Sequence, residues 1–133
     1  MQTRIIDEAD IDLQLDQSIR DLLVVAFPHA SQTFAAARRW RGSVPLFSVV
    51  IHDHDVLCAH LAVVDRTIRA ADQTLRVAGV ALVAVAPACR GRRLIDGALA
   101  AAMHEAAART FDCGFLFTHR PTNQIYARNG WLE

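Results

Sequence analysis

An apolar strand pattern that ends at a proline, continues through an arginine–glycine loop and enters a long helix constrains the fold most strongly. Val83–Ala86 precedes Pro87, and the predicted helix opens near Arg92 and reaches about Arg109. Asp96 in its first turn and Arg109 in its last turn suit the helix dipole. The order strand, loop and helix predicts a crossover connection that leads to a further, parallel strand of the same sheet.

The start of this helix lacks a side chain that could cap it. Residues 88–91 contain no Ser, Thr, Asp or Asn, so the first four backbone N–H groups need another partner. Arg90, Gly91, Arg92 and Arg93 surround that start. A helix N-terminus beside three arginines favours an anion such as phosphate or pyrophosphate. An ordinary turn with solvated arginines explains the same residues equally well.

Composition indicates a single globular domain, residues 1–133, in which 53% of the residues are hydrophobic. The formal net charge is zero, which argues against a nucleic-acid partner. The longest apolar run, Val77–Cys89, is too short to span a membrane, and the amino terminus has no signal pattern. Cys58, Cys89 and Cys113 lack Cys-x-x-Cys spacing, so we expect reduced thiols and a cytoplasmic location.

Hydrophobic periodicity predicts an α+β fold with an antiparallel meander, one crossover helix and a parallel neighbour strand. The predicted helices, besides the one at 92–109, are 10–27, 31–40 and 122–128. The predicted strands are 3–6, 46–51, 56–64, 74–86 and 115–118. Val80–Val85 is apolar on both faces, which places it at the centre of the sheet. The arginine cluster Arg38–Arg41 is expected to be a solvated helix end.

A second segment, Tyr126-Ala127-Arg128-Asn129-Gly130-Trp131, follows a short apolar strand. The order strand, arginine–glycine loop, helix, strand and Tyr-x-x-x-Gly-aromatic resembles the GNAT acyltransferase superfamily. Within it the chain is similar to the aminoglycoside 2'-N-acetyltransferases. Three features carry that likeness: Arg90-Gly91-x-Arg93-Leu94, Tyr126…Gly130-Trp131, and Ala59-His60 with the strand rhythm that follows it. The resemblance covers about residues 57–132.

This resemblance implies a GNAT-like mixed, mainly antiparallel sheet flanked by helices. It implies acetyl-CoA as co-substrate and transfer of its acetyl group to a primary amine of a small molecule, by direct attack in a ternary complex. The implied pyrophosphate loop is Arg90, Gly91, Arg92, Arg93 and Leu94. Backbone groups of Val83, Ala84 and Val85 would meet the pantetheine arm and polarise the carbonyl, and Tyr126 would be the general acid.

The general base is left open. Many family members carry an acid on the central strand, but the equivalent position here is Ala81. His60, His119 and Asp65 are candidates, and some family members use no side-chain base. The missing acid also supports an alternative, a catalytically degenerate acyl-CoA-binding sensor or interaction module of the same fold.

His52 and His54 offer only two converging ligands, so we expect no metal site. Cys89, beside the loop, is expected to pack rather than react.

Two expectations concern partners. The superfamily's one or two C-terminal strands have no counterpart after Trp131, so the Phe115–Thr118 strand should be an exposed edge. Two explanations stay open: the sequence is truncated there, or a partner chain, as in a homodimer, covers the edge. An aminoglycoside-like polycation would need an acidic pocket, and only acids near the amino terminus could build one. These are Asp7, Glu8, Asp10, Asp12, Asp16 and Asp21.

Overall fold

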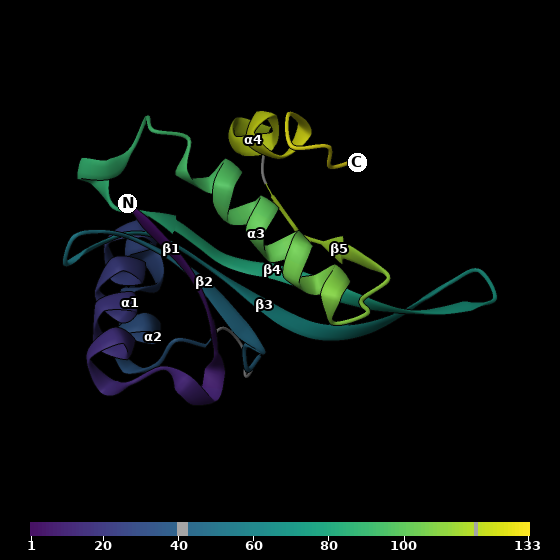
Figure 1. Cartoon of the computed structure of the whole chain (residues 1–133), viewed down its shortest axis with the longest axis horizontal. Helices are drawn as coiled ribbons and strands as arrows, with labels where there is room; N and C mark the ends of the chain where they lie inside the picture. The colour runs from purple at the N-terminus through teal and green to yellow at the C-terminus, as the bar shows by residue number, and fades with distance from the viewer. Residues whose placement is uncertain (40–42, 119) are drawn as a thin grey trace.

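The computed structural model describes residues 1–39, 43–118 and 120–133 (Figure 1). Within these ranges, one sheet has the strand order β1-β2-β3-β4-β5. The strands are β1 (Gln2–Asp7), β2 (Phe47–Asp53), β3 (Val56–Ala70), β4 (Gln73–Val85) and β5 (Cys113–Phe115). The first four pair antiparallel in sequence order, and β5 pairs parallel to β4. The predicted meander with a parallel neighbour strand is therefore confirmed.

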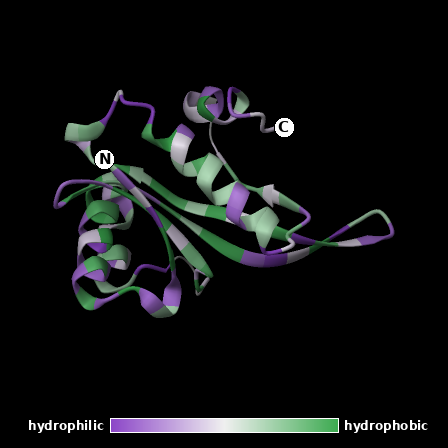
Figure 2. Ribbon diagram, in the orientation of Figure 1, coloured by the Kyte–Doolittle hydropathy of each residue, from purple (hydrophilic) through white to green (hydrophobic). Residues whose placement is uncertain are grey.

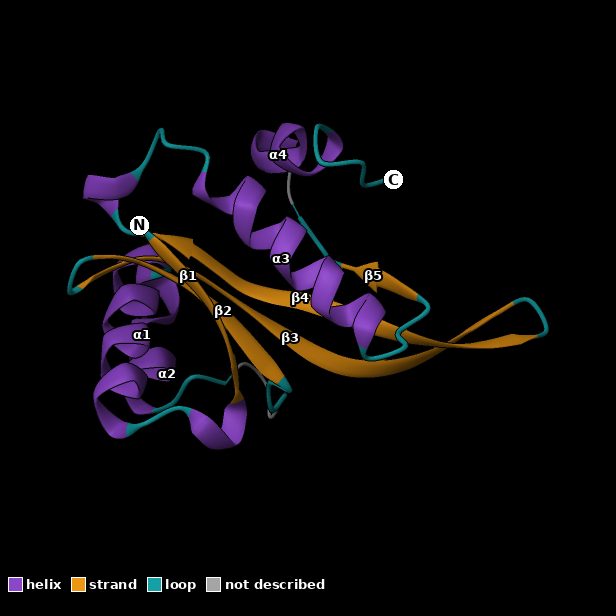
Figure 3. Ribbon diagram, viewed as in Figure 1, coloured by secondary structure: helices purple, strands orange, loops and turns teal. Residues whose placement is uncertain are grey.

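Helices cover both faces of this sheet. The α-helices are α1 (Leu13–Ala26), α2 (Ser31–Ala36), α3 (Leu94–Ala108) and α4 (Asn123–Ala127). Short 3-10 turns are η1 (Glu8–Asp10), η2 (Pro28–Ala30), η3 (Pro87–Cys89) and η4 (Arg120–Thr122). Figure 3 shows α1 and α2 on one side of the sheet and α3 across the other. The helix predicted at 31–40 ends earlier, at Ala36, and Trp40 lies outside the described residues.

Two apolar clusters hold the layers together. One lies under α3 and includes Phe47, Leu61 and Leu99, while the other lies under α1 and α2 and includes Ile19 and Leu23. Because side chains alternate along a strand, β2 and β3 contribute side chains to both clusters and are buried on both faces. Figure 2 shows this hydrophobic centre and the more hydrophilic tip of the hairpin formed by β3 and β4.

That hairpin is longer than predicted, because β3 continues from Val64 to Ala70. The pairing runs from Asp65 opposite Ala78 to Ala70 opposite Gln73. The hydrophobic pattern does not predict the strand beyond Val64, because this part of the β3–β4 hairpin extends out of the core and its residues are largely exposed. Backbone hydrogen bonds between the two strands, rather than apolar burial, define the strand there.

The strand predicted at 115–118 is shifted in the structure. β5 is Cys113–Phe115, and its ladder with β4 ends where Gly79 faces Phe115. Further along, β4 carries a β-bulge, because Leu82 and Val83 together oppose the single residue Leu61 of β3. Leu82 has a φ of 55°, in the left-handed region. A bulge bends its strand, so β4 diverges from the segment after β5, and the parallel ladder ends at Phe115.

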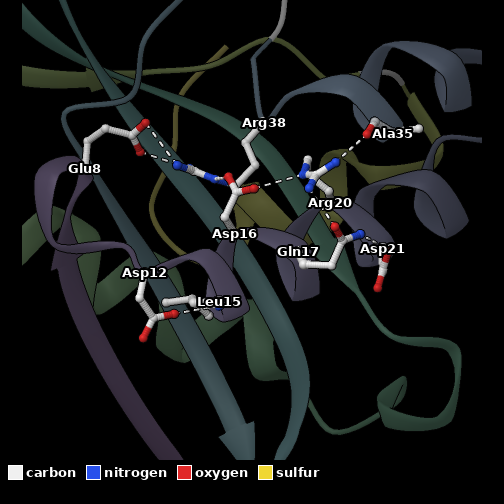
Figure 4. A network of polar contacts seen from close by, with 9 residues as sticks. All are labelled: Glu8, Asp12, Leu15, Asp16, Gln17, Arg20, Asp21, Ala35 and Arg38. Atoms are coloured by element: carbon white, nitrogen blue, oxygen red, sulfur yellow. Dashed lines mark hydrogen bonds and ion pairs between the residues drawn. The ribbon is translucent and has the colours of Figure 1, made fainter.

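An arginine staple joins the amino-terminal elements (Figure 4). Arg38 is only 9% exposed and is bound by two carboxylates. Its Nη1 donates to Glu8 Oε1 at 2.9 Å, and its Nε donates to Asp16 Oδ1 at 2.5 Å. Asp16 also accepts from Arg20 at 2.9 Å. The expectation of a solvated helix end is wrong for Arg38, because the chain after α2 turns back onto α1.

Replacing Arg38 by alanine should destabilise the fold by about 2–3 kcal/mol. Removing one partner of a buried ion pair leaves uncompensated charge, and the effect here falls below the fully buried case because both carboxylates stay partly exposed. Urea unfolding measures it. Asp65→Ala is the control, because it removes an exposed pair with Arg76 and should change the unfolding midpoint much less.

The same staple makes a prediction about pH. Burial alone raises the pKa of Asp16, but hydrogen bonds and charges from Arg38 and Arg20 outweigh it and leave the pKa below its usual 3.8. A carboxyl group whose pKa is lowered in the folded protein stabilises the fold at pH values above its usual pKa. That stabilisation is lost as the pH falls through the lowered pKa. The stability difference between wild type and Arg38→Ala should therefore shrink below about pH 4. A constant difference from pH 7 to about pH 2 would contradict this role for Asp16.

Candidate active site

Where β4 leaves β5, a cavity of about 380 Å³ lies between β4 and residues 116–118. Its walls are mostly apolar and come from β4, the segment after β5, α3, α4 and the end of α1. The lining residues are Phe27, Val80, Ala81, Leu82, Val83, Ile95, Leu116, Phe117, Thr118, Thr122, Ile125 and Tyr126. Such a cavity can hold a slender, largely apolar chain between two strand backbones.

The β4 bulge forms one wall of this cavity. Val83 lines it, Ala84 is buried opposite His60, and Val85 is half-buried at the end of the strand. A bulge takes backbone groups out of the regular ladder, so they become available to a ligand. These are the three residues that the sequence predicts for the pantetheine arm.

The predicted anion loop follows β4 and η3. Arg90, Gly91, Arg92 and Arg93 are exposed, and Leu94 opens α3 half-buried. Arg93 occupies the N-cap position with a φ of 53° and makes no side-chain cap, so the first N–H groups of α3 lack the side-chain partner that the sequence also lacks. Gly91 has a φ of +83°, and a Cβ built there would meet nothing within 4 Å, which leaves the backbone accessible.

The loop's arginines differ in their partners. Arg92 Nη1 lies 3.3 Å from Asp53 Oδ2 at the end of β2. Within the described ranges, Arg90 and Arg93 form no ion pair or side-chain hydrogen bond. Their charges are therefore available to an anion.

Cys89 anchors the start of this loop. It is 5% exposed, and its Sγ lies 2.6 Å from Sγ of Cys58 on β3. Both thiols are free, and burial raises the pKa of Cys58 to about 11. The buried position agrees with the packing role expected for Cys89.

Tyr126 projects from α4 into the cavity wall and is packed edge-on against Trp131, with ring centroids 6.4 Å apart at 77°. Trp131 lies so close to β5 that a Cβ on Gly114 would fall 2.7 Å from its ring. Burial raises the pKa of Tyr126, so the phenol keeps its proton at neutral pH.

A polar clamp ties α4 to the first turn of α3. Asp96 accepts from Arg128 Nη2 at 2.9 Å and from Asn129 Nδ2 at 2.8 Å. These hydrogen bonds hold the pKa of Asp96 below its usual range, so it is charged at neutral pH. The sequence interpretation assigned Asp96 only to the helix dipole. Its 32-residue separation from Arg128 gives no local signal of the contact.

The three candidate bases are placed differently. His60 is 1% exposed, its Nδ1 donates to Leu82 O at 2.9 Å, and its Nε2 has no partner among the described residues. Burial lowers the pKa of His60 to about 4, so the ring is neutral. His60 therefore supports the bulge from the sheet interior. Asp65 pairs with Arg76 on the hairpin and does not line the cavity. His119 lies outside the described residues.

Within the described part of the chain, no group of three or more His, Cys, Asp and Glu side chains gathers as metal ligands. None of the helices in that part is long and apolar enough to cross a membrane.

The family of the chain follows from comparison with known proteins. A model of the acetyltransferase (GNAT) domain family matches residues 8–132, so the chain belongs to that family. The GNAT fold, the acetyltransferase assignment and acetyl-CoA as co-substrate, all predicted from the sequence, are confirmed at this level. The narrower likeness to aminoglycoside 2'-N-acetyltransferases stays a prediction.

Solved structures share the fold at low sequence identity. A predicted acetyltransferase from Clostridium acetobutylicum, solved with acetyl-CoA, superposes with a TM-score of 0.73 at 18% identity, over 99% of this chain and 90% of that one. An aminoglycoside acetyltransferase from an uncultured soil sample gives 0.72 at 16% identity, over 99% and 91%. Glucosamine-6-phosphate N-acetyltransferase from Arabidopsis thaliana gives 0.67 at 14% identity, over 100% and 93%.

Replacing Asp96 by alanine should loosen α4 and with it Tyr126, because the clamp from Arg128 and Asn129 is lost. Hydrogen–deuterium exchange followed by mass spectrometry should show faster exchange at residues 120–131 and little change in β2 and β3. Asp65→Ala, which also removes an arginine-paired carboxylate, is the matched control. Equal exchange of this segment in wild type and Asp96→Ala would show that the clamp does not hold α4.

Proposed function

We propose that this protein, as one acyl-CoA-binding domain over residues 1–133, transfers an acetyl group from acetyl-CoA to a primary amine of a small molecule. The reaction is direct attack in a ternary complex, and its location is the cytoplasm. One observation carries the proposal: the cavity beside the β4 bulge contains Tyr126 and ends near a helix start with no side-chain cap and exposed arginines. Acetyl-CoA supplies the acetyl group and a thiolate leaving group.

Holding the donor falls to the loop before α3. The pyrophosphate would accept from the N–H groups at Gly91–Leu94 and from the guanidinium groups of Arg90 and Arg93. Arg92 already pairs with Asp53. Its main role would therefore be to hold the loop in place, with any contact to the anion in addition. The apolar cavity between β4 and residues 116–118 suits a pantetheine arm.

Polarising the carbonyl falls to the backbone at Val83–Val85. The bulge at Leu82 and Val83 directly precedes Ala84 and Val85, which pair with β3, and the His60 side chain donates to the carbonyl of Leu82. An N–H group held in this way is oriented before the substrate binds, which is the condition for effective stabilisation of developing negative charge.

Moving the last proton falls to Tyr126. Its Oη carries a proton at neutral pH and could donate it to the departing sulfur. Ala81 supplies no carboxylate at the position where the family often has one. We therefore propose that the amine enters as the free base, with His119 as the histidine candidate for relaying its proton. His60 is less suited, because it is buried and its pKa is about 4.

The second candidate is a degenerate acyl-CoA-binding sensor of the same fold. Ala81 in the cavity wall favours it, since no acidic side chain among the described lining residues could act as base. Tyr126 favours the enzyme, whereas the exposed arginines suit acyl-CoA binding by either candidate.

Whether the protein is an enzyme or a sensor, we expect a second copy of the chain to cover the edge of the sheet at β5. Phe115 is 42% exposed and Phe117 is 90% exposed beside that edge.

Replacing Arg90 and Arg93 together by alanine should weaken acetyl-CoA binding roughly 10- to 100-fold, because two charge-assisted contacts are lost. The salt dependence of binding should also decrease. Calorimetry measures both. The control is Arg66→Ala with Arg69→Ala, which removes the same charge from the β3–β4 hairpin and should leave the affinity unchanged. An equal loss of acetyl-CoA affinity in both double variants would mean that only the net charge matters. That result would contradict the assignment of the loop before α3 to the pyrophosphate.

Tyr126→Phe should lower kcat by about 100-fold or more and leave acetyl-CoA affinity nearly unchanged, because only the proton donor is removed. The assay is thiol release with a panel of amines at saturating acetyl-CoA. Wild-type rates should rise from neutral to mildly alkaline pH as the amine loses its proton. Equal rates in the two proteins would remove Tyr126 from the reaction. Acetyl-CoA binding without turnover of any amine would favour the sensor.

A further inference from the structure

The cavity beside the β4 bulge reaches from one face of the sheet to the other. Val83 and Ile95 in its wall belong to the packing under α3, whereas Leu82 and Phe27 pack with the cluster under α1 and α2. The loop assigned to the pyrophosphate leads into α3. If the proposed function holds, on which this inference rests, the donor occupies the α3 side. The amine then approaches from the side of α1 and α2.

Phe27 makes the wall on that second side and is held firmly. It is the C-cap residue of α1, where its N–H donates to Leu23 O at 2.8 Å. Its ring packs against Phe34 at 5.6 Å between centroids and edge-on against His29 at 6.4 Å. Phe34 is 2% exposed, so this support is part of the core. Phe27 therefore presents a preformed aromatic surface to whatever enters from this side.

The described part of the wall offers no negative charge to a second ammonium group. Among the described residues that line the cavity, none is Asp or Glu. The polar side chains on its wall are the hydroxyls of Thr118, Thr122 and Tyr126. An ammonium moved from water into such surroundings without a carboxylate loses its hydration and gains no counter-charge.

Four of the six amino-terminal acids that a polycation would need bind other groups of this chain (Figure 4). Glu8 and Asp16 bind Arg38, and Asp16 also binds Arg20. Asp12 caps α1 by accepting from Leu15 N at 2.8 Å, and Asp21 accepts from Gln17 at 2.8 Å. None of these four carboxylates lines the cavity. The other two, Asp7 and Asp10, line a different cavity together with Asp12. The acidic pocket considered from the sequence is therefore not part of the cavity beside the β4 bulge.

We propose that the acceptor is a monoamine with an apolar, preferably aromatic body that packs on Phe27 and Leu82, and not an aminoglycoside or other polycation. Phe27 is the residue that sets this preference. An aromatic body gains by leaving water and by edge or face contact with the Phe27 ring, whereas a polyamine would have to give up the hydration of its further charges.

The test measures amine binding separately from turnover. Calorimetry on the protein saturated with CoA, which carries no acetyl group, compares 2-phenylethylamine with spermidine and kanamycin. Phenylethylamine should bind at least about tenfold more tightly than either polycation. Phe27→Ala should weaken phenylethylamine binding roughly 10- to 100-fold and leave the affinity for CoA unchanged. Val25→Ala is the control, because Val25 is exposed near the same helix end and does not line this cavity.

Phe27→Leu covers the case in which the alanine variant does not fold. It keeps an apolar side chain but loses the ring, so phenylethylamine binding should weaken several-fold while the protein stays folded. Tighter binding of spermidine or kanamycin, no binding of phenylethylamine to the CoA-bound protein, or unchanged affinity in the folded Phe27 variant would overturn the proposal. Failure of CoA itself to bind would instead overturn the proposed function, so the two failures are distinguishable.

Discussion

The divergence of β4 from β5 is the constraint on which the rest of the candidate site depends. Parallel pairing ends where Gly79 faces Phe115, and the bulge at Leu82–Val83 then bends β4 away. A cavity forms between two backbones that would otherwise share hydrogen bonds. Each part of the proposed chemistry is placed relative to this opening: the anion loop after β4, the polarising backbone in the bulge and Tyr126 across the cavity.

Three buried or bridging polar contacts keep this opening in shape. His60 donates to Leu82 O and supports the bulge from inside the sheet. Asp96 binds Arg128 and Asn129 and so joins α4 to the start of α3. The Arg38 staple fixes the chain after α2 to Glu8 and Asp16, which holds α1 and its C-cap residue, Phe27, against the sheet. None of the three needs to touch a substrate to influence the reaction.

The sequence predicted the strand order, the crossover and the uncapped start of α3, because these follow from hydrophobic period, proline and the lack of capping residues. It misplaced β5 by two residues, since apolar content at Leu116 and Phe117 looks alike whether the segment pairs or lines a cavity. It treated Arg38 as solvated, which is wrong, and it named His60 as a candidate base without any sign of its contact with Leu82. The partners of these two residues, Glu8, Asp16 and Leu82, are 22 to 30 positions away in the chain, and single-sequence patterns report only local spacing.

We propose that the opening between β4 and residues 116–118 holds the thiol end of coenzyme A, and a crystal structure of the protein with bound CoA is the decisive test. In that structure we expect the pyrophosphate on the N–H groups at Gly91–Leu94, and the sulfur beside Val83 and within reach of Tyr126. Coenzyme A bound elsewhere, such as the groove lined by Arg4 and Arg109, with the opening filled by protein side chains, would contradict it.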